Sequence, residues 1–216
     1  MERHDGKLRR IPETTIRRLP AYLRALTLMG HDRVTSDALG QAAGYSSEQV
    51  RKDLAYFGAF GTRGVGYDAK MLAQEIRRIL QLDQGVRAIV VGAGRLGTAL
   101  VRHTDEISSD VVISAVVDVN PAVVGTQFDH LTVEPLERLE AVIQERDIGM
   151  GIITVPQSAA QAVANRLVEA GVRAILNFAP VALTVNDPTV FVQHIDLTLE
   201  MQALAYFVGS AARSEP

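Results

Sequence analysis

The chain of 216 residues contains neither cysteine nor tryptophan. Without cysteine it can form no disulfide, no thiolate metal site and no cysteine nucleophile, so any response to redox state must come from a bound cofactor. Its longest apolar runs have the length of strands and are too short for a helix that crosses a bilayer. The first ten residues are rich in charge and lack the apolar stretch of a secretory signal. We therefore expect a cytoplasmic protein that binds neither membrane nor metal.

The two parts of the chain differ in charge, although the net charge is only −3. Residues 1–80 carry 14 Lys and Arg against 9 Asp and Glu, whereas residues 81–216 carry 8 against 16. A basic first part on an acidic body favours contact with a polyanion such as nucleic acid. The alternative interpretation is a chance excess of solvated arginines.

Three helices are predicted in the first third of the chain. Apolar residues at helical spacing indicate a helix over residues 13–29, which Pro20 should kink or perturb. Capping residues and a following glycine indicate a short helix over residues 37–43, and a third helix, capped by a serine, extends to about residue 56. Two short helices joined by a turn and packed on a longer helix are the outline of a helix-turn-helix.

A glycine-rich segment follows the third helix. Residues 58–68 contain four glycines around Arg63, which indicates a tight β-hairpin. A hairpin in this place is the wing of a winged helix. A further helix near residues 69–82 then leads to a domain boundary at residues 83–85.

The third helix has an apolar face and a polar face. Val50, Leu54 and Phe57 share one face and should pack inward. An outward Arg or Lys can donate to guanine in the major groove, a serine at the helix start can contact phosphate, and a wing-tip arginine can enter the minor groove. The candidate DNA contacts are Ser46, Ser47, Gln49, Arg51, Lys52, Tyr56 and Arg63. The alternative is a solvated face with an intrahelical Glu48–Lys52 pair.

From residue 86 onward, predicted strands alternate with predicted helices. This order indicates an α/β fold with a parallel, doubly wound sheet of the Rossmann type. Strands are expected at residues 87–91, 111–118, 149–155 and 174–178, and helices near residues 96–105, 135–146, 158–170 and 196–208. We divide the chain into a winged-helix domain (1–84), a Rossmann domain (85–195) and a C-terminal helix (196–216).

A glycine pattern marks the start of the second domain. Gly92, Gly94 and Gly97 follow an apolar strand and precede a helix, and Asp118 ends the next strand, 21 residues after Gly97. In a Rossmann fold such glycines allow a tight turn against a pyrophosphate, and such an acid accepts both ribose hydroxyls and repels a 2′-phosphate. NAD(H) is therefore favoured over NADP(H), with S-adenosylmethionine, flavin or a vestigial empty site as alternatives. The candidate cofactor contacts here are Gly92, Ala93, Gly94, Arg95, Leu96, Gly97, Asp118 and Val119.

Two later loops should line the same crevice, because ligands of open α/β sheets bind outside the carboxyl ends of the strands. These candidates for the nicotinamide half are Thr154, Val155 and Pro156, and Asn177, Phe178, Ala179 and Pro180. Each can equally be an ordinary proline-bearing loop. Neither loop holds a His, Lys, Tyr or carboxylate that could move a proton, so we predict no catalytic residue.

Several stretches, in one order along nearly the whole chain, resemble a known family. They are R-R-L-P-A-Y-L-R (17–24), Q-V-R-K-D-L-A-Y-F-G-A-F-G-T-R-G-V-G-Y (49–67), V-V-G-A-G-R-L-G (90–97), T-V-P (154–156), I-L-N-F-A-P (175–180) and H-I-D-L (194–197). The chain resembles the Rex family, the redox-sensing transcriptional repressors of bacteria. The stretch over residues 49–67 is the most specific of the six.

The resemblance implies a homodimer that binds palindromic operator DNA through two winged helices. NADH would close the dimer and release the DNA, while NAD+ competes and leaves the DNA-bound form possible. Arg51 and Lys52 would lie at the major groove and Arg63 in the minor groove. The C-terminal helix would swap between subunits, so that Asp196 lies near the partner's nicotinamide and pairs with Arg24 in the DNA-binding state.

Two positions depart from the family pattern. His103 stands where many members carry tyrosine, and Leu197 stands where some carry phenylalanine. His103 can still hydrogen-bond Asp196, and the switch would then respond to pH, since imidazole titrates near neutral pH. Leu197 offers a nicotinamide less apolar contact than phenylalanine does.

We predict a redox-sensing repressor without catalytic activity, with NADH and NAD+ as regulatory ligands. One rival hypothesis is a small NAD-dependent dehydrogenase with an accessory helical domain. Another is a protein-interaction module that senses nucleotide, for which no salt-dependent affinity for DNA is expected.

Overall fold

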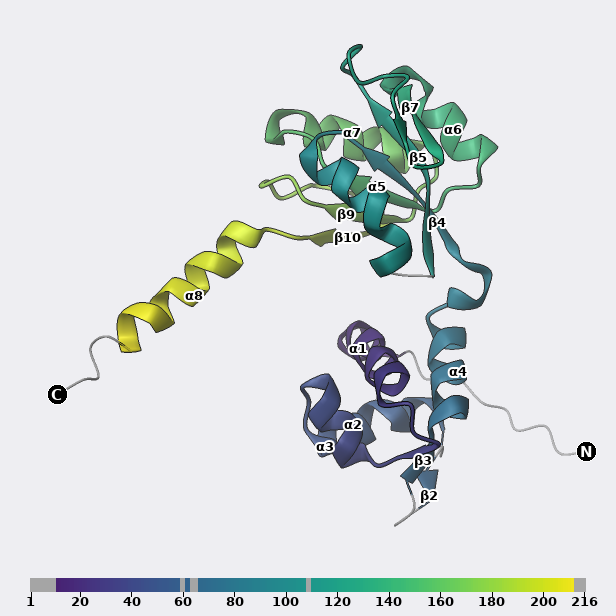
Figure 1. The fold of residues 1–216 in the computed structure, drawn as a ribbon, viewed down its shortest axis with the longest axis vertical. Helices are drawn as coiled ribbons and strands as arrows, with labels where there is room; N and C mark the ends of the chain where they lie inside the picture. The colour runs from purple at the N-terminus through teal and green to yellow at the C-terminus, as the bar shows by residue number, and fades with distance from the viewer. Residues whose placement is uncertain (1–10, 59–60, 63–65, 108–109, 212–216) are drawn as a thin grey trace, which may run out of the picture. The chain divides into compact units, whose positions relative to one another are not determined.

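The computed structural model describes residues 11–58, 61–62, 66–107 and 110–211 (Figure 1). The chain divides into two compact units, Met1–Gln84 and Gly85–Pro216, called here the N-terminal unit and the C-terminal unit. Within the described ranges, no helix has the length and apolar character needed to cross a membrane. The same ranges contain no group of three His, Asp or Glu side chains arranged to hold a metal ion.

Four α-helices lie in the part of the N-terminal unit that the structure describes. They are α1 (Glu13–Met29), α2 (Ser36–Ala43), α3 (Ser47–Leu54), which continues as a 3-10 turn (Ala55–Phe57), and α4 (Ala69–Ile79). Their apolar faces meet in one core whose fully buried members include Leu19, Tyr22, Leu39, Val50, Leu54, Leu72 and Ile76. Helix α1 continues through Pro20, so the proline does not end it.

Side chains cap three of these helices at their N-termini, as the sequence predicts for α2 and α3. The hydroxyl of Thr35 accepts a hydrogen bond from the N–H of Ala38, and that of Ser46 accepts one from the N–H of Gln49. The carboxylate of Asp68 caps α4 in the same way. Each cap satisfies one of the backbone N–H groups that the first turn of a helix leaves without an internal partner.

A small antiparallel sheet completes the N-terminal unit. It contains β1 (Arg33–Val34), β2 (Gly61–Thr62) and β3 (Gly66–Asp68), in the order β1-β3-β2. The pairing of β2 with β3 confirms the hairpin expected over residues 58–68. Arg63, the predicted wing-tip residue, lies outside the described residues.

A seven-stranded sheet forms the C-terminal unit, in the order β10-β9-β8-β4-β5-β7-β6. Its parallel strands are β4 (Val86–Val91), β5 (Val111–Asp118), β7 (Leu131–Pro135), β8 (Met150–Ile153), β9 (Ala174–Asn177) and β10 (Phe191–His194), and β6 (Gln127–Phe128) pairs antiparallel at one edge. The chain moves outward from β4 through β5 to β7 and then returns to β8 on the other side of β4. The order therefore reverses between β4 and β8, which is where ligands of doubly wound folds bind.

Both faces of the sheet are buried. Ile89 and Val91 point into one core with α6 (Leu139–Glu145) and α7 (Gln157–Glu169), and Ala88 and Val90 point into another with α5 (Arg95–Ile107). This alternation explains why residues 88–91 of β4 are all apolar, since neither face of the sheet meets water there. Figure 1 shows the helices lying over the two faces.

Several strand and helix boundaries differ from the expectations. The strand expected at residues 149–155 ends at Ile153, and Pro135, expected to begin a helix, ends β7. The residues of β6, β7 and β10 were not expected to form strands. All three are short, with two to five residues.

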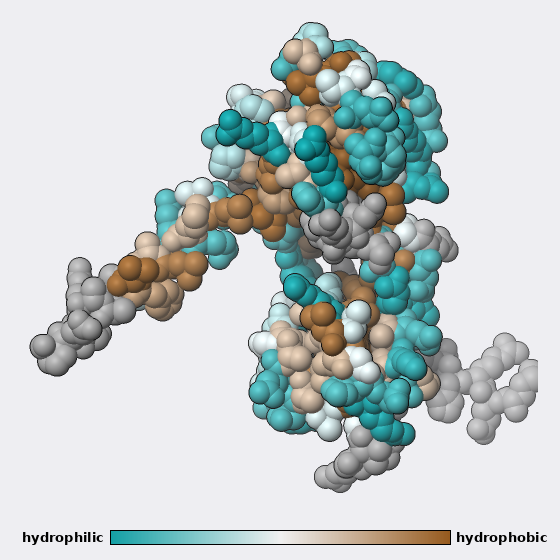
Figure 2. Space-filling model, viewed as in Figure 1, coloured by the Kyte–Doolittle hydropathy of each residue, from teal (hydrophilic) through white to brown (hydrophobic). Residues whose placement is uncertain are grey.

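The chain closes with α8 (Leu197–Ala211). Its apolar residues Leu199, Leu204, Phe207 and Val208 are 61–74% exposed. Figure 2 shows the apolar colour along this helix.

Candidate functional site

The turn between β4 and α5 is built on glycines that a larger residue could not replace. Gly92 has φ +105°, and a Cβ added there would lie 2.8 Å from the carbonyl oxygen of Thr154. A Cβ on Gly97 would lie 2.0 Å from the carbonyl oxygen of Gly92. The absence of side chains therefore lets the first turn of α5 pack directly on the end of β4.

Gly94 differs from the other two glycines of the pattern. It is exposed, and a Cβ added there would meet no atom within 4 Å. The backbone at the N-terminus of α5 thus faces open space, and its N–H groups are available to an anion that approaches closely. This is the arrangement that a pyrophosphate requires from the second glycine of a dinucleotide-binding turn.

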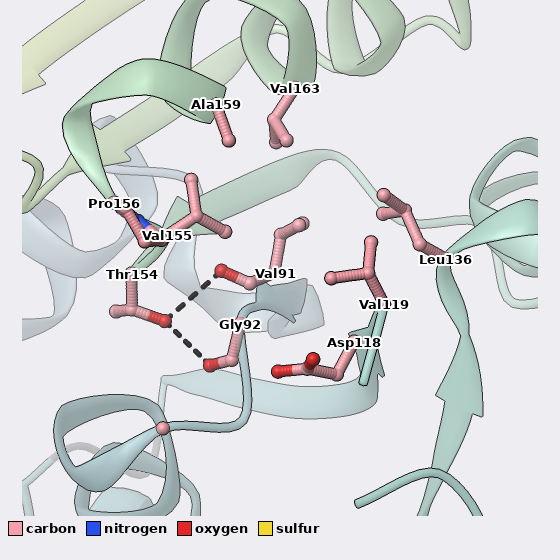
Figure 3. Close-up of a pocket in the computed structure, with 11 residues that line it drawn as sticks. Val91, Gly92, Asp118, Val119, Leu136, Thr154, Val155, Pro156, Ala159 and Val163 are labelled. Carbon is pink, nitrogen blue, oxygen red and sulfur yellow. Dashed lines mark hydrogen bonds between the residues drawn. The ribbon is translucent and has the colours of Figure 1, made fainter. Parts of the chain in front are cut away.

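A pocket of about 190 Å³ lies beside this turn (Figure 3). Its lining is apolar apart from one carboxylate and one hydroxyl, and consists of Val91, Gly92, Gly94, Asp118, Val119, Leu136, Thr154, Val155, Pro156, Ala159 and Val163. Pockets for complete drug-sized ligands usually measure about 300–1,000 Å³. The volume therefore suits one end of a dinucleotide, and Asp118 supplies the carboxylate in its lining.

Asp118 links the end of β5 to the glycine turn. One of its carboxylate oxygens accepts a hydrogen bond from the N–H of Ala93 at 2.6 Å, and the other accepts one from the N–H of Asn120 at 2.8 Å. Each oxygen has a second lone pair, so the carboxylate can also accept from the hydroxyls of a ribose. Its negative charge disfavours a phosphate at the same place.

Thr154 connects β8 to β4 at the point where the strand order reverses. Its hydroxyl contacts the carbonyl oxygens of Gly92 at 2.7 Å and Val91 at 3.1 Å, shown as dashed lines in Figure 3. The hydroxyl proton is therefore used within the protein. Val155 and Pro156, which follow it, line the pocket.

The loop after β9 is organised by Asn177, whose side chain is fully buried. Its amide nitrogen donates to the carbonyl oxygens of Ala179 and Val181, and its amide oxygen accepts from the N–H of Ala179. The same nitrogen lies 3.1 Å from Nδ1 of His194. Asn177 thus shapes the loop that carries Phe178 and Pro180, and none of these residues lines the pocket beside Asp118.

Four pocket residues were not predicted as contacts: Val91, Leu136, Ala159 and Val163. Leu136 follows β7, a strand that the sequence pattern did not indicate. Ala159 and Val163 are spaced for one face of α7 and are indistinguishable by sequence from core residues. Ala159 and Val163 can be recognised as pocket residues only when the order of the strands is known, because that order places α7 beside Asp118.

The predicted switch residues lie on separate elements. Arg24 is exposed on α1, in the N-terminal unit, and His103 is exposed on α5. Asp196 precedes α8 and caps it, because its carboxylate accepts hydrogen bonds from the N–H groups of Thr198 at 2.9 Å and Leu199 at 3.4 Å. The cap explains locally why the last helix begins where it does.

The polar face of α3 is a candidate nucleic-acid interface. Arg51 and Lys52 are exposed, whereas Val50 and Leu54 are buried. Ser46 is exposed at the cap, and Ser47 and Tyr56 are half-buried beside it. Gln49, a predicted DNA contact, is half-buried, and its side-chain amide donates to the buried carboxylate of Asp53 at 3.0 Å.

Two family models match separate parts of the chain. The one described as "Putative DNA-binding protein N-terminus" matches residues 10–55, and the one described as "CoA binding domain" matches residues 83–181. The first match contains α1 to α3, and the second contains the glycine turn and the pocket.

Similar proteins cover nearly the whole chain. The redox-sensing transcriptional repressor Rex of Streptomyces avermitilis is 44% identical over 96% of this chain and 83% of its own length. The Rex of Syntrophomonas wolfei is 43% identical over 94% of this chain and 98% of its own length.

Solved structures give the same result. The crystal structure of RSP with β-NAD+ and operator DNA has a TM-score of 0.85 and 33% identity, over 94% of both chains. The structure of RSP, described as a Rex-family repressor, with β-NADH has a TM-score of 0.81 and 31% identity, over 94% of this chain and 97% of that one. With these identities over more than nine-tenths of its length, the chain belongs to the Rex family of redox-sensing transcriptional repressors.

Proposed function

We propose that this chain binds palindromic operator DNA as a homodimer and is released from it when NADH binds. One observation carries the proposal: the same chain holds an exposed Arg51–Lys52 pair on α3 and a glycine turn facing Asp118. The relative RSP has been crystallised with β-NAD+ and operator DNA and with β-NADH. The cytoplasm, where operator DNA and NADH meet, is the proposed location.

In the proposed complex the nucleotide lies across the carboxyl ends of the strands. The N–H groups of Gly94, Arg95 and Leu96 hold the pyrophosphate. Asp118 accepts the ribose hydroxyls, which favours NAD(H) over NADP(H). The adenine occupies the apolar pocket between Val119, Leu136 and Pro156, and the nicotinamide half extends toward the loop of residues 177–180.

The DNA half of the proposal assigns base contacts to Arg51 and Lys52 in the major groove. Ser46, Ser47 and Tyr56 contact phosphates, and Arg63 enters the minor groove. Gln49 can reach the DNA only with the part of its amide that Asp53 does not use.

Release requires that NADH bind the DNA-free form of the dimer better than the DNA-bound form, since a ligand shifts an equilibrium only through this difference. By linkage, operator DNA must weaken NADH binding by the same factor. We assign the coupling to α8, exchanged between subunits, and to Asp196 with Arg24 and His103. No step of this function changes a covalent bond.

The test is a titration of the full chain on a palindromic operator, repeated with NADH and with NAD+. We expect NADH to weaken binding and NAD+ to compete with NADH. A matched pair of variants separates DNA binding from NADH binding. Lys52→Ala should lose affinity for the operator and retain affinity for NADH, whereas Asp118→Ala should bind the operator and fail to release it when NADH is added.

A third variant tests the pyrophosphate assignment directly. Gly94→Val places its side chain in open space, so the fold should be retained while NADH binding is lost. Wild-type release of Asp118→Ala and Gly94→Val at ordinary NADH concentrations contradicts the cofactor assignment. Steady formation of NADH from NAD+ with alcohols or hydroxy acids would instead support a dehydrogenase.

A further inference from the structure

A buried charged cluster joins α1 to α3 within the N-terminal unit. Its centre is Asp53 on α3, whose side chain is 1% exposed. Its carboxylate accepts hydrogen bonds from the hydroxyl of Thr15 at 2.9 Å, from Nε and Nη2 of Arg18 at 2.6 and 2.7 Å, and from the hydroxyl of Tyr22 at 2.8 Å. With Gln49, which also donates to it, these residues form what we call the Asp53 cluster.

The cluster is ionised at neutral pH. Burial alone would raise the pKa of Asp53, but hydrogen bonds from Arg18, Tyr22 and Thr15 outweigh it and hold that pKa below its ordinary value. Burial and the neighbouring carboxylate raise the pKa of Tyr22, so its hydroxyl keeps the proton that it donates. Because both partners of a buried ion pair give up their hydration, such a pair adds little net stability, and we infer that this one serves to select one arrangement of α3.

The bonds fix α3 in two respects. On α1 the donors Thr15, Arg18 and Tyr22 occupy one face over two turns, and on α3 Gln49 and Asp53 lie one turn apart. Apolar contacts between the same helices tolerate small rotations because they have no direction, whereas the four hydrogen bonds that cross from α1 to Asp53 do not. The cluster therefore sets the rotation of α3 about its own axis and its position along α1.

The rotation of α3 determines which side chains face outward. Asp53 follows directly after Arg51 and Lys52, so the bond that turns Asp53 inward leaves those two residues exposed. Tyr22 also packs edge-on against Tyr45 in the turn before α3, with ring centroids 5.6 Å apart. The cluster thus controls both the start and the last turn of the helix.

We propose that Asp53 is a positioning residue for operator recognition: by anchoring α3 to α1 it fixes the orientation in which Arg51 and Lys52 meet the bases. The inference rests on the proposed function. It also gives Gln49 the role of orienting Asp53 within α3 and not that of contacting bases. Asp53 itself touches no DNA.

The test compares operator DNA with a scrambled site of the same length, using full-length Asp53→Asn. Asparagine keeps the shape but turns one acceptor into a donor that opposes Arg18. We expect operator affinity to fall about tenfold, the cost of one lost base contact, while affinity for the scrambled site and for NADH stays within about twofold. Glu13→Gln is the matched control, because it removes the same charge from an exposed pair on α1 and should change neither affinity.

A purely structural role predicts a different result. DNA binding is measured under conditions in which urea unfolding shows both proteins to be fully folded. If the role is purely structural, Asp53→Asn discriminates operator from scrambled DNA as well as the wild type does, and the inference is overturned. Tyr22→Phe removes one bond and retains the ion pair, so it decides the question if Asp53→Asn does not fold; we expect a loss of discrimination of about threefold. If the wild-type chain does not bind operator DNA, the proposed function is overturned. If the wild type binds the operator and the variants discriminate it from scrambled DNA equally well, only this inference is overturned.

Discussion

Both units of the chain use an arginine to bind a carboxylate across two helices, with nearly the same geometry. In the N-terminal unit Arg18 of α1 donates to Asp53 of α3 at 2.6 and 2.7 Å. In the C-terminal unit Arg166 of α7 donates to Glu140 of α6 at 2.6 and 2.8 Å. The surroundings differ: the side chains are 20% and 1% exposed in the first pair, and 32% and 45% exposed in the second.

The difference shows that the contribution of an arginine–carboxylate pair to stability depends on its exposure to water. Water can replace either partner of the exposed pair, so that pair adds little to stability. Water cannot reach Asp53, so losing its partner leaves a buried charge without compensation. In the C-terminal unit the two-faced apolar sheet supplies the stability. There Arg166 acts locally, since it also donates to the carbonyl oxygen of Leu136, a pocket residue.

The largest expected effect comes from Asp53→Ala. It leaves the buried hydroxyls of Thr15 and Tyr22 and the partly buried guanidinium of Arg18 without their acceptor, and we expect the N-terminal unit to lose about 3–5 kcal/mol of stability. Urea unfolding followed by tyrosine fluorescence measures this, because four of the five tyrosines lie in residues 1–84. NADH binding should be unchanged, which serves as the control. Equal destabilisation of both units would contradict the separation drawn between them.

Acid should weaken the same unit with the sign that the pKa shift of Asp53 dictates. The pKa of Asp53 is lower in the folded chain than its ordinary value of 3.8. Its contribution is therefore complete above that value and is lost as the pH falls through the folded pKa. Unfolding experiments below about pH 4 should show a steeper loss for the wild type than for Asp53→Asn, which has no such proton to gain. Parallel curves for the two proteins would show that Asp53 is not the group responsible.

Local signals in the sequence predicted much of the fold. The helix over residues 13–29 and the strand over residues 111–118 have the expected ends, because periodicity and flanking residues act within a few positions. The glycine turn and Asp118 were equally readable, since each is required by the geometry of one βαβ unit. Sequence alone therefore located the turn and the carboxylate that line the pocket in the structure.

The features that could not be predicted from the sequence depend on contacts between residues far apart in the chain. Arg18 and Asp53 are 35 positions apart, and Asp53 on a helix with polar neighbours resembles a solvated residue. For the same reason the sequence indicated Gln49 only as a DNA contact and not as a partner of Asp53. Leu136 enters the pocket only because β7 pairs with β5, and a strand of five residues has too few positions to establish a period.

A smaller effect is expected from Arg166→Met, on binding rather than on stability. Methionine keeps the apolar stem but removes the hydrogen bonds to Glu140 and to the carbonyl of Leu136. Leu136 should then be held less firmly against the adenine, and we expect NADH affinity to fall about threefold, the value of one hydrogen bond. Calorimetric titration with NADH measures it, and Arg173→Met, on an exposed pair remote from the pocket lining, is the control. A loss equal in both variants would trace the effect to charge alone.

The smallest effect belongs to Glu140→Gln, and it tests the comparison most directly. The hydrogen bond from Arg166 lowers the pKa of Glu140, so the pair is ionised, yet both side chains meet water and salt. Glutamine retains one acceptor for Arg166, and screening by solvent limits the cost to about 0.5 kcal/mol, falling further in high salt. Urea unfolding of the C-terminal unit in low and high salt measures this loss of stability. Since the bond lengths match those of Arg18–Asp53, a cost as large as that of Asp53→Ala would mean that geometry, and not burial, determines what such a pair contributes.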